Sequence, residues 1–132
     1  MDDRYAPTLD EIAELAEAAR AALPEAYQTA ARAVALRVED FAPDDLLAGL
    51  GISDPFQLTG LYQGTPLTEK SVFDQPIGPD VIWLFRRPIL DEWTERGDIG
   101  LAALVTHVFV HELAHHFGWS DADIARIDRW WE

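Results

Sequence analysis

Residues 111–115 read His-Glu-Leu-Ala-His, with two histidines four positions apart and a glutamate beside the first. On an α-helix, residues i and i+4 lie one above the other, so His111 and His115 would present their imidazoles to one ion. Glu112 is rotated by about 100° around the helix from His111, where it could hold a water molecule without being a ligand. The pattern therefore predicts a Zn²⁺ site, with His111 and His115 as ligands and Glu112 as the catalytic base of a hydrolytic reaction.

The residues after this pentapeptide extend the pattern. Gly118 follows His115 by three positions, and Asp121 follows Gly118 by three more. Glycine lets a helix end with positive φ, so Gly118 would form a turn that brings the Asp121 carboxylate to the ion as third ligand. In a chain of this composition the pentapeptide would arise by chance about once in a hundred sequences, and the longer pattern about once in ten thousand. The extended motif is thus the stronger evidence for a metal site.

Each of these residues also has a purely structural interpretation. The two histidines could be core residues, but an apolar helix would then have to satisfy three polar groups, which favours metal binding. Asp121 lies in Ser120-Asp121-Ala122-Asp123. That sequence is also typical of a helix N-terminus, where the helix dipole favours acidic residues. The ligand role and the helix-start role of Asp121 both stay open.

Three further polar residues lie in or near the motif. His107 precedes His111 by four positions, so it would support the site from outside the ligand set or lie at its mouth. Tyr62 lies in a glycine-flanked segment and could donate to an oxyanion, although an ordinary turn tyrosine is the simpler interpretation. His116 is expected to face away from the ion and to serve packing or a hydrogen bond.

The elements that must position these residues follow from hydrophobic periodicity and turn signals. Thr8 and Glu11 form a capping-box pattern at the start of the first helix. The chain is apolar on nearly all sides from Ile99 to Phe117, so this helix must lie in the middle of the fold. In chain order we expect helices over residues 9–23, about 44–50, 89–96, 99–117 and 120–131, and strands over 34–40 and 81–85. Pro24 either ends the first helix or begins a second, short one. One extended piece is expected at 58–62, in a loop over 51–80.

These elements predict an α+β fold. The 132 residues suit a single domain spanning residues 1–132, with about five helices and a small sheet of two or three strands. The His-Glu-Leu-Ala-His segment would lie on the central buried helix. Residues 81–85 form a continuous apolar run, whose length and residue types favour a buried strand over a helix.

Composition limits the partners. The formal net charge is −14, with 24 acidic and 10 basic residues, and no cluster of Lys and Arg is present. Nucleic-acid backbones and acidic membrane surfaces are therefore excluded as expected partners. The chain has no cysteine, so thiolate metal ligands are excluded. No basic, apolar leader is visible at the N-terminus, which favours a cytoplasmic protein.

The extended motif resembles that of the metzincin zinc peptidases, in the variant with Asp as third ligand. More closely, the chain is similar to the minimal zincin-like metallopeptidase family of bacteria, through residues 38–40, 60–68 and 111–121. The similarity implies a zincin-like fold, zinc at His111, His115 and Asp121, and a peptide or protein substrate. Two functions remain open: peptide-bond hydrolysis, and a non-catalytic module that binds metal or a protein partner. An open coordination position beside an edge strand would favour the enzyme, and a site blocked by the loop around 60–68 would favour the module.

Overall fold

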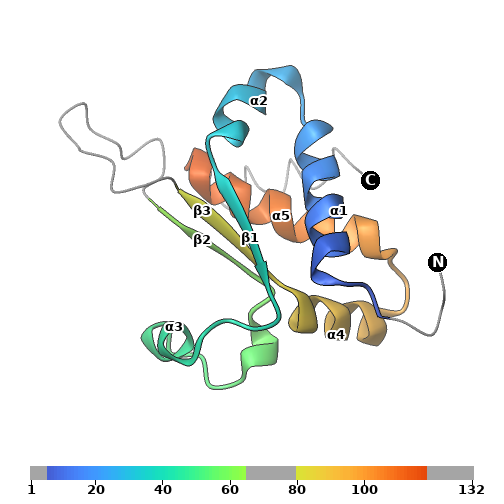
Figure 1. The fold of residues 1–132 in the computed structure, drawn as a ribbon, viewed down its shortest axis with the longest axis vertical. Coiled ribbons are helices and arrows are strands. Elements are labelled where there is room, and N and C mark those ends of the chain that lie inside the picture. The colour runs from blue at the N-terminus through green and yellow to red at the C-terminus, as the bar shows by residue number, and fades with distance from the viewer. Residues whose placement is uncertain (1–5, 65–79, 119–132) are drawn as a thin grey trace.

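The computed structural model describes residues 6–64 and 80–118. Within these ranges the chain forms five α-helices, one 3-10 helix and a three-stranded sheet (Figure 1). The elements in chain order are α1 (Leu9–Ala21), α2 (Glu25–Arg32), β1 (Ala35–Glu39), α3 (Asp44–Gly49), η1 (Pro55–Gln57), β2 (Gly60–Gln63), β3 (Val81–Phe85), α4 (Arg86–Arg96) and α5 (Leu101–Phe117). The α+β prediction is confirmed.

The strand order in the sheet is β1-β3-β2. The central strand β3 pairs in parallel with β1 and antiparallel with β2. Ile82 and Leu84 face one side of β3 and Phe85 faces the other, and all three are fully buried. Burial on both faces explains why residues 81–85 are apolar without alternation. The same order places β2 at an edge of the sheet within the described part of the chain.

Helices α1 and α5 pack against each other and against the face of the sheet that carries Ile82 and Leu84 (Figure 1). The Thr8 side chain caps α1 by accepting a hydrogen bond from the Glu11 backbone N–H at 3.1 Å. Eight of the 17 residues of α5 are buried, seven of them apolar as the sequence predicts, and a stripe of polar residues along the helix is half-buried. The main core is therefore built around the helix that carries the His-Glu-Leu-Ala-His segment.

A second, smaller cluster covers the opposite face of the sheet. Phe85, Ala42 and Leu47 form its buried centre, and Leu61 and Trp83 pack against it. Alternation along the strands assigns Leu61 to this face and its neighbours Gly60 and Tyr62 to the α5 face. The edge strand β2 is thus held from both sides.

The remaining predicted boundaries differ from the structure by a few residues. The helix expected at Ile89 begins at Arg86, because Pro88 lies in its first turn, where the missing N–H would have no intrahelical acceptor. The extended piece expected at 58–62 is the strand Gly60–Gln63. The helix expected over 120–131 lies outside the described residues. None of the helices that the structure describes is long and apolar enough to cross a membrane.

Candidate metal centre

Helix α5 carries the predicted ligands near its C-terminal end. Gly118 follows the last helical residue in the left-handed conformation, with φ 75°. Its backbone N–H donates to the His115 carbonyl oxygen at 3.0 Å. A side chain is disfavoured in this conformation, so glycine lets the chain leave the helix directly after the histidines.

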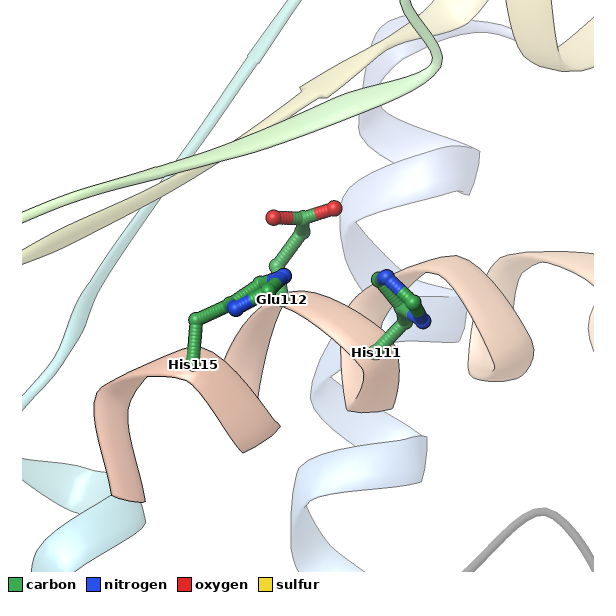
Figure 2. A group of neighbouring side chains, drawn as sticks. All are labelled: His111, Glu112 and His115. Atoms are coloured by element: carbon green, nitrogen blue, oxygen red, sulfur yellow. The ribbon is translucent and has the colours of Figure 1, made fainter. Parts of the chain in front are cut away.

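His111, Glu112 and His115 each offer one ligand atom, and these atoms all lie within 4.8 Å of one another. Figure 2 shows the three side chains extending from α5, with the Glu112 carboxylate directed toward the strands. The two imidazole ring centroids are 5.2 Å apart, with an angle of 79° between the ring planes. All three residues are half-buried.

The Glu112 carboxyl group lies between α5 and the edge strand β2. A Cβ atom added to Gly60 would lie 3.3 Å from Glu112 Cγ and 2.7 Å from Val108 Cγ1, so only glycine fits this contact without displacement. Burial raises the pKa of Glu112 from 4.5 to about 7, and a backbone hydrogen bond from Tyr62 opposes the shift. In the metal-free protein this carboxyl group can therefore take up or release a proton near neutral pH.

The donor set fits zinc. Imidazole nitrogens are typical zinc donors, and a carboxylate oxygen can complete the set. Tetrahedral ligands at ~2.1 Å from zinc are about 3.4 Å apart, and the ligand atoms of His111 and His115, which lie within 4.8 Å of each other, are close enough to share one ion. A cation at this position would favour the charged form of Glu112 and so lower its pKa.

Comparison with known proteins agrees with this geometry. The sequence matches the family model of zincin-like metallopeptidases over residues 31–131. The chain belongs to the zincin-like metallopeptidase family. A comparison with curated proteins gives no match. The matched range includes the whole of the extended motif, through Asp121.

The other residues predicted for this zincin-like site fall in three different places. The His107 ring centroid is 6.4 Å from that of His111, and among the described residues His107 is not part of the group at ligand distance. Tyr62 belongs to β2, and its hydroxyl donates to Asp80 Oδ2 at 2.7 Å, so the arrangement gives no support to an oxyanion role. Asp121 lies outside the described residues.

Sequence reasoning missed two residues near the zincin-like centre, Asp80 and Gly60. His116 is buried, and its Nδ1 lies 2.9 Å from Asp80 Oδ2, so it forms the hydrogen bond expected of it. Asp80 is 36 residues from His116 and 18 from Tyr62 in sequence, and no local pattern connects them. The only indication for Gly60 was its residue type, because a glycine within a strand often marks a place where another part of the chain approaches closely.

Proposed function

We propose that this chain is a zinc-dependent metallopeptidase that hydrolyses peptide bonds with Glu112 as general base. One observation carries the proposal: the partly buried Glu112 carboxyl group lies within 4.8 Å of the ligand atoms of His111 and His115. The match to the zincin-like metallopeptidase family supports the same chemistry. A structural zinc site would not need a glutamate with a raised pKa beside its ligands.

In the proposed site, His111 and His115 hold zinc through their imidazole nitrogens, and Asp121 supplies the third ligand. Bound zinc contributes Lewis acidity, which activates water and polarises the amide carbonyl. Glu112 accepts a proton as water attacks the carbonyl carbon and then delivers that proton to the leaving amine nitrogen. Without metal, burial raises the pKa of Glu112 to about 7, and bound zinc would lower it, so that the carboxylate would be charged and able to accept the proton.

The edge strand β2 offers a way to bind the substrate. In the described part of the chain it pairs only with β3, so its other edge can form backbone hydrogen bonds with an extended peptide. Gly60 and Tyr62 of this strand both approach Glu112. A peptide added along β2 would therefore lie beside the base.

The decisive variant is Glu112→Gln. It should retain zinc, because the amide is not needed for coordination, and lower turnover by about a hundredfold or more. Glu95→Gln is the matched control: it makes the same chemical change on an exposed position of α4 and should leave turnover unchanged. Turnover would be measured on a panel of unfolded proteins and mixed peptides, with zinc content determined for each preparation.

Two results would overturn the proposal. If the zinc-loaded wild type cleaves nothing in the panel, the non-catalytic module replaces the enzyme as the better interpretation. If cleavage persists undiminished in Glu112→Gln, the activity belongs to a contaminating protease or to another group of the chain.

A further inference from the structure

A buried polar cluster lies beside the metal centre and joins three elements. Tyr62 comes from β2, Asp80 directly precedes β3, and His116 lies in the last turn of α5. Tyr62 donates its hydroxyl proton to Asp80 Oδ2 at 2.7 Å, and His116 Nδ1 lies 2.9 Å from the same oxygen and 3.2 Å from the tyrosine hydroxyl. The side chains of His116 and Asp80 are only 2% and 10% exposed. We call these three residues the Asp80 cluster.

Holding the sheet against α5 does not require such a cluster. Apolar contacts would join the same elements without the cost of removing polar groups from water. A hydrogen-bonded polar network instead specifies one relative geometry, because displaced partners lose their hydrogen bonds in a low dielectric. The backbone is closely fitted here as well: a Cβ atom on Gly64 would lie 2.8 Å from Asp80 Cβ.

The Asp80 cluster reaches the metal centre by two routes. Tyr62 uses its side chain to contact Asp80 and its backbone to form a hydrogen bond with Glu112. His116 is the residue next to His115, and it lies two positions before the turn at Gly118. The base and one ligand are thus each connected to the same carboxylate.

We propose that Asp80 is a positioning residue for the metal centre. Through Tyr62 it fixes the part of β2 that bonds to Glu112, and through His116 it fixes the turn of α5 that carries His115. Its catalytic consequence rests on the proposed peptidase function, but its effect on metal binding does not.

The test compares Asp80→Asn with Val105→Ala. Val105 is fully buried on the same helix, six positions before His111, and its truncation destabilises α5 without touching the cluster. Zinc affinity would be measured by competition with a chelating dye, and ligand geometry by the visible absorption of the Co²⁺-loaded protein. Asp80→Asn should weaken zinc binding by about tenfold and change the Co²⁺ spectrum, because groups that orient ligands typically affect metal affinity on this scale. Val105→Ala should change neither, although its thermal stability falls.

Tyr62→Phe gives a second, gentler measurement, because it removes one oxygen atom from the cluster. It should weaken zinc binding in the same direction, and its effect should be smaller in the Asp80→Asn background than in the wild type, as expected for partners in one network. If both cluster variants bind zinc as tightly as Val105→Ala and give the wild-type Co²⁺ spectrum, Asp80 serves stability alone and the inference fails. Wild-type protein that binds zinc but cleaves no peptide would refute the peptidase and leave this comparison intact.

Discussion

The close contact of β2 with α5 at Gly60 makes a quantitative prediction for the variant Gly60→Ala. The added methyl group would lie 2.7 Å from Val108 Cγ1 and 3.3 Å from both Glu112 Cγ and the Trp83 carbonyl oxygen. Carbon atoms in relaxed contact are ~3.5–4.0 Å apart, so the strand, the helix or the valine side chain must move by about 1 Å.

Two opposing contributions set the size of the effect. Overpacking of this kind costs about 1–3 kcal/mol in folding free energy. Gly60 is not among the glycines with positive φ, so alanine can adopt its conformation and gains ~0.4–1 kcal/mol by restricting the unfolded chain. The net expectation is a loss of about 1–2 kcal/mol. For a chain of this size, each kcal/mol lowers the melting temperature by about 4 °C.

The assay is a double-mutant cycle with Val108→Ala, followed by urea unfolding of the metal-free proteins. Val108→Ala removes the Cγ1 atom that the new methyl group meets, so Gly60→Ala should cost little in that background. A coupling energy of about 1 kcal/mol or more would be well outside ordinary additivity. The reasoning is refuted if Gly60→Ala is as stable as the wild type, or if it costs the same in both backgrounds.

Three further predictions concern the metal centre. The wild type should bind about one zinc ion per chain, and His115→Ala should abolish stoichiometric binding in a metal titration at neutral pH. Asp121→Asn should sharply weaken zinc binding with little loss of thermal stability; unchanged affinity with altered stability would make Asp121 a helix-start residue. Because burial raises the pKa of Glu112 from 4.5 to about 7, its contribution to metal-free stability is complete below pH 4.5 and is lost as the pH rises through 7. Glu112→Gln should lack this pH dependence of unfolding, which amounts to at most about 3 kcal/mol, and identical pH profiles would contradict the burial argument.

The parts of the site that lie within one helix could be predicted from the sequence. Helical periodicity fixes the relative directions of residues 111, 112 and 115 before any tertiary structure is known. The continuous apolar run at 81–85 likewise predicted a buried strand, and the structure places this strand at the centre of the sheet. Such features depend on short-range geometry alone.

The surroundings of Glu112 could not be predicted in this way. Strand pairing and helix packing bring Gly60, Tyr62 and Asp80 to α5. His116, for example, contacts Asp80, which is 36 positions away in the sequence, and Tyr62, which is 54 positions away. Periodicity carries no information about which strand will lie against a given helix turn. The sequence therefore brought His111, Glu112 and His115 together as a candidate site, whereas the groups that set the position and the pKa of Glu112 emerge only from the fold.

The edge strand β2 links substrate binding to proton transfer in the proposed mechanism. In the described part of the chain β2 pairs only with β3, and the same strand buries Glu112 at Gly60 and bonds to it from the Tyr62 backbone. A shift of β2 that alters the path of the peptide would therefore also change the solvation of the base. Since burial is the main cause of the raised Glu112 pKa, variants that loosen β2 should lower this pKa in the metal-free protein even when both histidines remain in place.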